Sequence, residues 1–502
     1  MSRHRGTMSS KNTAKTRWTD AILAVAILLS SGCVVGPNYR TPVVETPPGY
    51  KEAENWKPAE PNDQNLGGNW WTVFQDPQLD ALEGQVDVSN QNLKAAQAQY
   101  QGARAVLRYD RADYYPTITA NPSASRTRVS ANAPPPGAIS DGKTYNDFLL
   151  PLDLSYEVDV WGRVRREVES AREQAQASAA DLATVNLSMH ADLAVDYFEA
   201  RSLDAQEQLL NTTVTEYQQA LDLNENRFQG GLTSEVEVEQ ARTQLETTRA
   251  QAIDVGVLRA QYEHAVAILI GKPPAEFTLP PLPLTAPPPP IPVSVPSKLL
   301  ERRPDIAASE RRVAVANAQI GVAKAAYYPQ IDLGAAGGFE STDIANLLTG
   351  PSGWWSVGAS AVETVFDAGR RHAAADEART AYDSQVAAYR ESVLSGFQEV
   401  EDNLAALRIL ENEAKVQDQA VAAAQSSLNL SISRYQGGVT SYLEVTVAQS
   451  AALSDEVTAV SILGRRMANT VFLIQALGGG WDRSSLPPRP ECCGKLVSAN
   501  SN

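Results

Sequence analysis

The chain has few of the residues that most catalytic and metal-binding sites require. Its 502 residues include three cysteines and four histidines, and they contain no Cys-x-x-Cys pair, no metal-ligand spacing and no phosphate-binding glycine loop. His190, His264 and His372 lie far apart in expected helices, where we expect partly exposed surface positions. The acidic residues are spaced along helices, where solvated faces and helical ion pairs explain them. An enzyme is therefore the less favoured class of function.

Positive charge and long apolar runs are also scarce. The formal net charge is −16, and it becomes −20 when an N-terminal segment with five basic residues and one acidic residue is set aside. Such an acidic chain argues against nucleic acid as a partner. No later segment has the uninterrupted apolar run of a membrane helix, so we expect any crossing of a bilayer to use β-strands.

Residues 1–32 have the composition of a secretory signal peptide. Basic residues precede an apolar run over residues 21–29, which is too short to span a bilayer, and Ser30-Ser31-Gly32 then leads to Cys33. This ending resembles a bacterial lipoprotein box, although Ser30 replaces the usual leucine. We predict that Cys33 carries a diacylglycerol and an N-acyl chain, and that Val34 favours the outer membrane. No other cofactor is expected.

Proline is missing from two long tracts, and glycine is missing from part of the first. No proline occurs within residues 152–272 or 352–486, and no glycine occurs within residues 163–229. Alanine, glutamine, glutamate and leucine are abundant there, so we predict a 67-residue helix over residues 163–229. At ~1.5 Å per residue it would be roughly 100 Å long. An equivalent helix is expected over residues 370–436, interrupted at Gly396. An isolated coiled coil would show the same pattern.

The sequence repeats itself over a long period. RFQGGLTS at residues 227–234 returns as RYQGGVTS at residues 434–441, an offset of 207, whereas YYPTI at residues 114–118 returns as YYPQI at residues 327–331, an offset of 213. A duplicated domain explains both offsets, with the six-residue difference in the Pro-rich loop near residues 133–137. We divide the chain into a signal peptide (1–32), an N-terminal lipidated tether (33–74), repeat 1 (75–271), a Pro-rich linker (272–297), repeat 2 (298–478) and a C-terminal tail (479–502).

Each repeat also contains a pair of segments that resemble β-strands. From Leu152 to Val160 apolar residues alternate with acids and Ser155, although a soluble half-buried strand would look the same. We expect its partner to begin at Thr117, and the strands of repeat 2 to cover residues 331–339 and 355–365. Four strands cannot close a membrane barrel, so a chain that spans the membrane must oligomerise, with eight strands as a dimer or twelve as a trimer.

A glycine pair ends each long helix. Gly230-Gly231 stops the first one, and Thr233 or Ser234 is placed to cap a return helix that we expect to reach about Ile270. In repeat 2 the return helix is expected over residues 441–477. Each repeat therefore reads helix, strand, loop, strand, very long helix, tight turn, helix.

Several motifs occur in order along the chain: CVVGPNY at residues 33–39, WW at 70–71, DVWGR at 159–163, LERRPDI at 300–306, ERR at 310–312, and the two glycine-pair turns. Together they resemble the TolC-type outer-membrane efflux proteins, specifically the lipoprotein branch of OprM and NodT. Asn38 departs from the aspartate that is usual in the first motif. The resemblance covers nearly the whole mature chain.

The resemblance implies an α+β membrane protein with two tandem repeats, four barrel strands per chain and very long periplasmic helices. Three chains would form a twelve-stranded β-barrel continuous with a twelve-helix α-barrel. Such a homotrimer is the exit duct of a tripartite efflux system, held in the outer membrane of a Gram-negative bacterium. It receives substrates from an inner-membrane pump of the resistance-nodulation-division type through a periplasmic adaptor protein.

By the same resemblance the two turns are tips that meet the adaptor. The expected docking residues are Arg227, Gly230, Gly231, Leu232, Thr233, Arg434, Gly437, Gly438, Val439 and Thr440. Glycine permits a left-handed backbone and leaves little side chain in the way of a docking helix, although ending a helix is also part of its role.

Leu428 and Ile432 lie four residues apart on one helical face, just before the second turn. They predict an apolar ring that closes the tunnel, with ordinary interhelical packing as the alternative.

A surface-anchored coiled-coil scaffold is a third class of function. It would explain the long helices and the lipid, but not the paired strands. Replacing Cys33 would distinguish the scaffold from the membrane duct. A scaffold would then become soluble, whereas a membrane duct would still need detergent for extraction.

Overall fold

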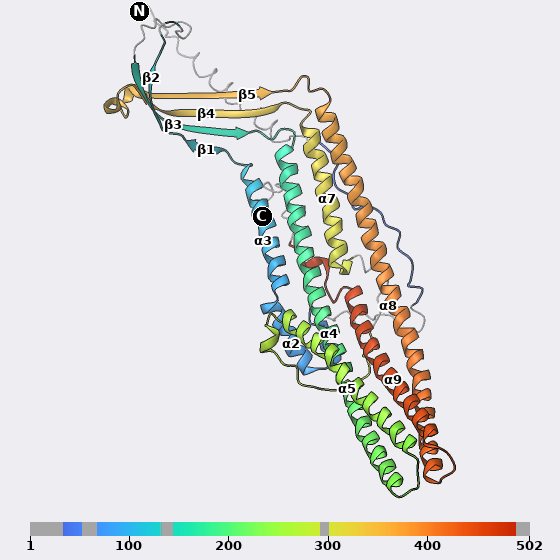
Figure 1. Cartoon of the computed structure of the whole chain (residues 1–502). Coiled ribbons are helices and arrows are strands. Elements are labelled where there is room, and N and C mark those ends of the chain that lie inside the picture. The colour runs from blue at the N-terminus through green and yellow to red at the C-terminus, as the bar shows by residue number, and fades with distance from the viewer. Residues whose placement is uncertain (1–33, 53–67, 131, 133–143, 292–300, 488–502) are drawn as a thin grey trace, which may run out of the picture. The chain divides into compact units, whose positions relative to one another are not determined.

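The computed structural model describes residues 34–52, 68–130, 132, 144–291 and 301–487, and the structural statements below concern these residues (Figure 1). Cys33 and the signal peptide lie outside them. The helices are η2 (Trp70–Phe74), α2 (Pro77–Ser89), α3 (Gln91–Ala112), α4 (Arg163–Gln229), α5 (Glu235–Leu269), α7 (Pro304–Ala325), α8 (Arg370–Gln436) and α9 (Tyr442–Ala476), with short 3-10 turns between. The strands are β1 (Thr117–Ala120), β2 (Ser123–Arg128), β3 (Thr144–Glu157), β4 (Gln330–Ser341) and β5 (Gly353–Val362).

These elements belong to two compact units. Unit 1 holds the residues up to 42 together with 102–175 and 310–387, and it contains the whole sheet. Unit 2 holds residues 43–101, 176–309 and those from 388 onward.

All strands of unit 1 form one antiparallel sheet in the order β1-β3-β4-β5 (Figure 1). β2 also pairs with β3, so β1 and β2 cover successive parts of the same neighbour. Asn121 and Pro122 separate them, and proline has no N–H to donate to the ladder. β1 and β2 therefore act as one interrupted strand, and the prediction of four strand positions is confirmed.

Several strand limits differ from the predicted ones. β1 begins at Thr117 as predicted, but β3 begins at Thr144, eight residues before Leu152, and ends at Glu157, so Val158 and Val160 lie beyond it. β5 ends at Val362, so Val365 lies outside the fourth strand. Apolar alternation continues past the last paired residue because it marks side-chain environment and not backbone pairing.

The register places unlike residues on the two faces of the sheet. Leu152 lies opposite Gly337 and Leu154 opposite Ala335, whereas Asp153 lies opposite Ala336. Opposed residues share a face, and successive residues alternate between faces. One face therefore gathers Ile118, Leu150, Leu152, Leu154, Leu333, Phe339, Trp355 and Val357, and the other gathers Thr119, Asp153, Ser155, Glu157, Asp332, Glu340, Ser356 and Ser360. This is the pattern of a sheet that borders lipid on one side and water on the other.

The two long helices have the predicted limits. α4 and α8 each contain 67 residues, and each begins and ends where the sequence indicates. The interruption expected at Gly396 was wrong, because α8 is continuous there. A Cβ added at Gly396 would lie 3.3 Å from Ile306 Cδ1 and 3.4 Å from Arg303 Nε. Close packing against the start of α7, and not a helix break, explains this glycine.

The hairpins α4–α5 and α8–α9 pack against each other in unit 2 (Figure 1). α9 has the length and composition of a membrane span, but Arg465 and Arg466 lie within it, so its apolar run is not uninterrupted. In addition, 44% of its apolar window is buried inside the fold, and Val445, Ile462 and Val471 are among its buried residues. These contacts are those of a core helix.

His190 is buried, so the expectation of a partly exposed position was wrong for this residue. Its Nδ1 lies 2.6 Å from Glu83 Oε2 on α2, its Nε2 lies 3.2 Å from Asp87 Oδ1, and its ring stacks on Trp71 at 4.4 Å. The sequence analysis missed this cluster because its members are about a hundred residues apart in the chain. The contacts fasten α2 to α4.

Burial and charge shift the pKa values of this pair. Burial raises the pKa of Glu83 to about 7, although the hydrogen bond from His190 opposes the shift. Burial alone lowers the pKa of His190, but the hydrogen bonds and charges of Glu83 and Asp87 outweigh it, so the pKa of His190 is raised. Both groups therefore hold a proton more firmly in the folded chain.

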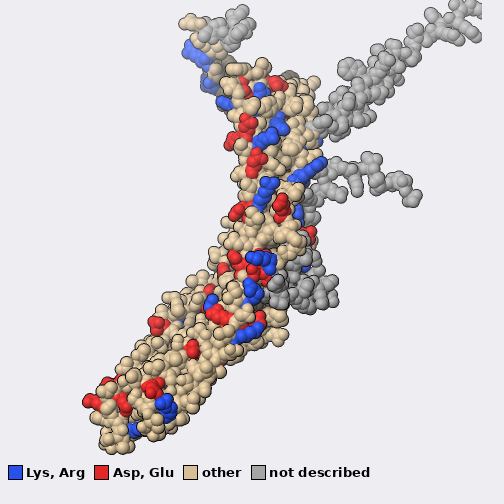
Figure 2. Space-filling view, turned by 90° about the vertical axis from the view of Figure 1, so that its right-hand side faces the viewer, with Lys and Arg blue, Asp and Glu red and all other residues tan. Residues whose placement is uncertain are grey.

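Charged side chains of both signs are interspersed on the face drawn in Figure 2. Within the described chain, charged side chains one helical turn apart form ion pairs, such as Arg249 with Glu246 at 2.8 Å and Lys415 with Glu411 at 2.8 Å. Exposed pairs of this kind contribute little to stability individually. They agree with the interpretation of the acidic residues as solvated helical faces.

Candidate functional site

The first hairpin turn ends α4 with a left-handed glycine. Gly231 has φ +72°, its N–H donates to the Phe228 carbonyl at 2.9 Å, and the N–H of Leu232 donates to the Arg227 carbonyl at 2.8 Å. This pair of bonds is the Schellman arrangement, in which the left-handed position favours glycine.

The second turn repeats this geometry. Gly438 has φ +69°, its N–H donates to the Tyr435 carbonyl at 3.0 Å, and the N–H of Val439 donates to the Arg434 carbonyl at 2.9 Å. Among the described residues of the two glycine pairs, only the second glycine of each pair is left-handed; Gly230 and Gly437 are not. Ser234 stands at the N-cap of α5, one of the two predicted positions, but its side chain makes no cap hydrogen bond there. Ser441 stands at the N-cap of α9, also without a side-chain cap hydrogen bond.

Both tips present an apolar side chain beside open backbone. Leu232 is 74% exposed and Val439 is 71% exposed. A Cβ added at Gly231 or Gly438 would meet no other atom of the chain within 4 Å. Thr233 and Thr440 follow as half-buried residues. A partner can therefore approach the backbone of either turn closely.

The arginines at matching positions of the two turns make different contacts. The guanidinium carbon of Arg227 lies 4.8 Å from the centre of the Tyr435 ring. Arg434 is exposed instead, with its Nη1 3.6 Å from Glu444 Oε2. A cation over an aromatic face is attractive, whereas an exposed ion pair contributes little. The similarity of the two turns in sequence does not extend to these side chains.

A buried apolar cluster joins the two hairpins behind the turns. We name it the tip cluster, and it comprises Tyr217, Leu221, Val238, Ala241 and Leu245 of the first hairpin and Tyr435, Tyr442 and Val445 of the second. The rings of Tyr435 and Tyr442 meet edge to face at 5.2 Å. The Tyr435 hydroxyl donates to Oδ1 of Asn224, which is buried on α4 and uses its Nδ2 to bond the Ala220 carbonyl.

Tyr435 is a contact between the repeats that was not predicted from the sequence. The residue at the same position of repeat 1 is Phe228, which is 45% exposed, whereas Tyr435 is 5% exposed. The one difference visible in the sequence is that Tyr435 carries a hydroxyl that Phe228 lacks. This difference does not predict that the hydroxyl donates a hydrogen bond to Asn224, which is far away in the chain.

Leu428 and Ile432 pack against the tip cluster as partly buried side chains. This is the interhelical packing that the sequence analysis named as the alternative to an apolar ring. A ring around a pore axis requires side chains from several chains, so the aperture role of this pair stays a prediction.

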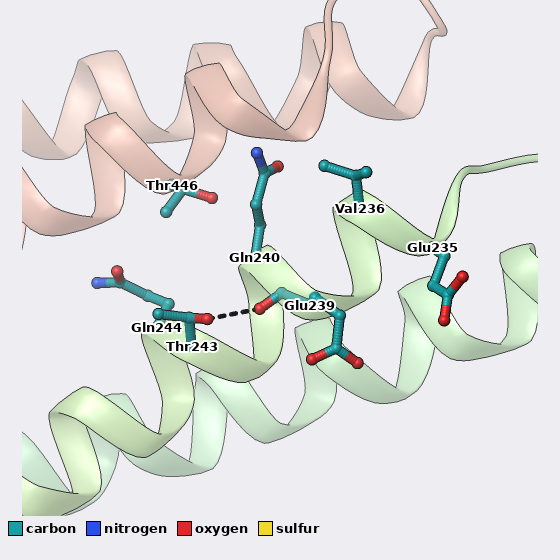
Figure 3. A pocket seen from close by; sticks show the side chains of 7 residues that line it. All are labelled: Glu235, Val236, Glu239, Gln240, Thr243, Gln244 and Thr446. Carbon is teal, nitrogen blue, oxygen red and sulfur yellow. Dashed lines mark hydrogen bonds between the residues drawn. The ribbon is translucent and has the colours of Figure 1, made fainter.

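A groove of about 530 Å³ lies beside the first tip (Figure 3). Glu235, Val236, Glu239 and Gln240 line it from the first turns of α5, and Thr446 lines it from α9. The groove therefore offers two carboxylates and one apolar side chain to a partner. Within the part of the chain that the structure describes, no group of three His, Cys, Asp or Glu side chains is placed to hold a metal ion.

Comparison with known proteins gives a consistent result. The sequence pattern of the outer membrane efflux protein family matches the chain twice, over residues 83–272 and 295–479. The toluene efflux pump outer membrane protein TtgF of Pseudomonas putida is 32% identical over 483 residues, which cover 94% of this chain and 99% of TtgF. The cation efflux system protein CusC of Escherichia coli is 31% identical over 463 residues, covering 91% and 98% of the two chains.

Solved structures show the same fold. The outer-membrane channel OprN superposes with a TM-score of 0.84 and 28% identity, covering 89% of this chain and 100% of OprN. The CmeC outer membrane channel of Campylobacter jejuni superposes with a TM-score of 0.84 and 25% identity, covering 90% and 96% of the two chains.

Proposed function

The chain belongs to the outer membrane efflux protein family, and on that premise we propose that three copies form one closed, lipid-anchored duct that docks a periplasmic adaptor with its hairpin tips. As a member of this family it is the outer-membrane channel of a tripartite efflux pump in a Gram-negative bacterium. It extends into the periplasm and is not an enzyme. The TolC-like fold with two repeats, expected from the motifs, is confirmed.

The edges of the sheet support the trimer. Within the described chain, β5 pairs only with β4, and the interrupted strand β1–β2 pairs only with β3. In lipid, each unpaired backbone group costs several kcal/mol, so both edges must find partners in other chains. Three chains supply twelve strands and close the barrel. Light scattering of detergent-solubilised protein should give three chains, and a stable folded monomer refutes the assembly.

Lipidation of Cys33 follows from the signal peptide and the small residues before it. Barrel closure buries far more apolar surface than acyl chains do, so the lipid should be dispensable for reaching the membrane. Mass spectrometry should find the acyl chains, and a Cys33→Ser protein with a replaced signal peptide should still insert. Recovery of that variant as a soluble periplasmic protein contradicts the spanning sheet.

The two Schellman turns carry the adaptor proposal. Each presents a left-handed glycine with open space around it and an exposed apolar residue, Leu232 or Val439. The carboxylates of Glu235 and Glu239 in the adjacent groove suit a partner helix tip with basic side chains (Figure 3). The adaptor would then contact six turns per trimer, two from each chain.

Large side chains introduced at the two tips test this proposal. Gly231→Trp with Gly438→Trp should abolish export, because a large side chain blocks close approach of the adaptor. The matched control is Gly231→Ala with Gly438→Ala, which imposes the same left-handed strain, ~1 kcal/mol at each turn, with little bulk. Export that survives the tryptophans, or a trimer that fails to assemble with them, contradicts the docking role.

The relatives TtgF and CusC are named for toluene efflux and cation efflux. We propose that this chain forms a passive channel for the substrates. An inner-membrane pump of the resistance-nodulation-division type would select which substrates enter it. A photo-reactive residue at Leu232 should cross-link the adaptor in intact cells, and co-purification should then recover the pump. A cross-linked adaptor that brings down a pump of another class refutes that assignment.

A further inference from the structure

Charges of opposite sign are sorted between the two faces of the sheet. We name the face that gathers Leu150, Leu152 and Leu154 the lipid face, and the opposite one the water face. Within the described strands, every acid lies on the water face: Asp147, Asp153, Glu157, Asp332 and Glu340. The two basic strand residues, Arg126 and Arg128 of β2, lie on the lipid face instead. Acids belong on a face that borders water, whereas arginines on a face that borders lipid require a reason.

The pairing of β2 with β3 fixes the face of both arginines. Arg126 lies opposite Asn146 and Arg128 lies opposite Thr144, and directly opposed residues share a face. Successive residues of a strand alternate between faces, so Asn146 and Thr144 share the face of Leu150. Both arginines are exposed. Their position on the lipid face therefore follows from the register and not from a side-chain conformation.

The lipid face of β3 shows where the apolar layer ends. Its apolar residues follow one another along the strand: Tyr156, Leu154, Leu152, Leu150 and Phe148. The next two residues on this face, Asn146 and Thr144, are polar. From Tyr156 to Phe148 the strand rises roughly 27 Å, which is roughly 20 Å across a membrane at a tilt of about 40°. Membrane barrels have an apolar band of about this height with aromatic residues at both edges, so the band ends at Phe148.

The two arginines lie just outside this band. Along the strand, Arg126 is roughly 7 Å and Arg128 roughly 14 Å beyond the level of Phe148. This end of the sheet is the one away from the start of α4 (Figure 1). Since the long helices extend into the periplasm, it meets the outer leaflet of the membrane. An arginine at the bilayer centre is strongly destabilising, whereas one at the headgroup level costs little.

We propose that Arg126 and Arg128 form a binding site for the phosphate groups of lipopolysaccharide, the glycolipid of the outer leaflet. This inference rests on the proposed membrane barrel. The lipid A part of lipopolysaccharide is a phosphorylated disaccharide, whose phosphates lie directly above its acyl chains and so at the level of these arginines. A guanidinium donates two parallel N–H bonds to a phosphate and keeps its charge at every physiological pH.

The neighbouring side chains suit the same ligand. The amide of Asn146 and the hydroxyl of Thr144 share the face of the arginines and can donate to phosphate or sugar oxygens. Phe148 and Leu150 continue this face as the apolar surface for the acyl chains. Asp147, between Asn146 and Phe148, lies on the water face, where its charge repels an anion. One glycolipid therefore meets matching chemistry along its whole length.

The site supplies positive charge where the leaflet needs it. Packed phosphates repel one another, so an anionic leaflet closes tightly around a protein only if cations lie at the boundary. β2 is part of an edge strand, so each site lies where two chains of the proposed barrel meet. A trimer carries three such sites around its outer rim.

Charge removal at the two arginines tests the inference. Arg126→Gln with Arg128→Gln removes the site, and the matched control is Arg379→Gln with Arg390→Gln, which removes the same charge from exposed positions of α8. A third protein adds Ser125→Arg and Thr127→Arg to the Arg126→Gln, Arg128→Gln pair. It restores the charge at the same level but on the water face. Native mass spectrometry of each detergent-solubilised trimer, titrated with diphosphoryl lipid A, gives the Kd.

We expect the Arg126→Gln, Arg128→Gln pair to weaken binding of diphosphoryl lipid A roughly 25-fold, which is about 5-fold for each basic residue near an anionic surface. The α8 control should bind as the wild type does, and the charges on the water face should not restore affinity. Arg126→Lys with Arg128→Lys should keep part of it, because lysine retains the charge without the paired N–H bonds. Dephosphorylated lipid A should bind the wild type and the glutamine pair alike.

An unchanged Kd in the glutamine pair, or an equal loss in the α8 control, overturns the inference. An equal loss of phosphatidylglycerol binding overturns it as well, because the arginines would then attract any anionic lipid. The single variants Arg126→Gln and Arg128→Gln give the same test if the pair fails to assemble. Light scattering of the same samples tests the trimer separately, so a wild-type trimer that binds no lipid A refutes the inference and leaves the proposed function standing.

Discussion

The Tyr435 hydroxyl offers the sharpest test of how the two hairpins hold together at their tips. Tyr435→Phe keeps the ring, so its contacts with Tyr442 and Arg227 remain and no cavity forms. What is lost is the hydrogen bond to Asn224 Oδ1, on a residue that is 1% exposed, together with a longer one to Glu237 Oε2 at 3.4 Å. A buried acceptor without its donor costs about 1–3 kcal/mol, which corresponds to a roughly 5- to 150-fold larger opening constant.

Hydrogen exchange of the detergent-solubilised trimer measures this opening locally. Amides of residues 221–245 and 428–445 should exchange faster by that factor, whereas amides of the sheet should not change. The control is Phe228→Tyr at the matching position of repeat 1, where an added hydroxyl meets solvent because Phe228 is 45% exposed. Unchanged exchange in Tyr435→Phe, or equal acceleration in the control, refutes the assignment of this bond as a link between the repeats.

Three further predictions concern other parts of the chain. Gly396→Leu should destabilise unit 2 by about 1–3 kcal/mol, measured by urea unfolding, because it overpacks the contact with α7. An unchanged unfolding midpoint would contradict the close contact between α8 and α7 at Gly396. Because burial raises the pKa of Glu83 to about 7 and the pKa of His190 is also raised, the folded chain binds more protons than the unfolded one, and the unfolding temperature should fall as pH rises from 4.5 through about 7. Glu83→Gln should flatten that slope, and a profile identical to wild type contradicts the role of the pair. Replacing Leu428 and Ile432 by serine should raise single-channel conductance in a planar bilayer; unchanged conductance assigns both residues to packing.

The secondary structure of this protein is determined largely by its sequence. The limits of α4 and α8 follow from the absence of proline within them and from left-handed glycines just outside their ends, because proline disrupts a helix interior and a left-handed glycine cannot continue a helix. The left-handed turns at Gly231 and Gly438 follow from the repeated glycine pairs, since the Schellman arrangement needs only local backbone bonds. Strand alternation was also readable, with errors only at the strand ends.

Roles that depend on a distant partner were decided by the tertiary structure alone. Gly396 looked like a helix break and is a packing contact, and His190 looked like a surface residue and is buried against Glu83. Tyr435 and Phe228 occupy the same position of the two repeats, yet only Tyr435 is buried. Backbone preference acts over a few neighbouring residues and is written locally in the chain, whereas burial is set by whichever side chain arrives from elsewhere in the fold.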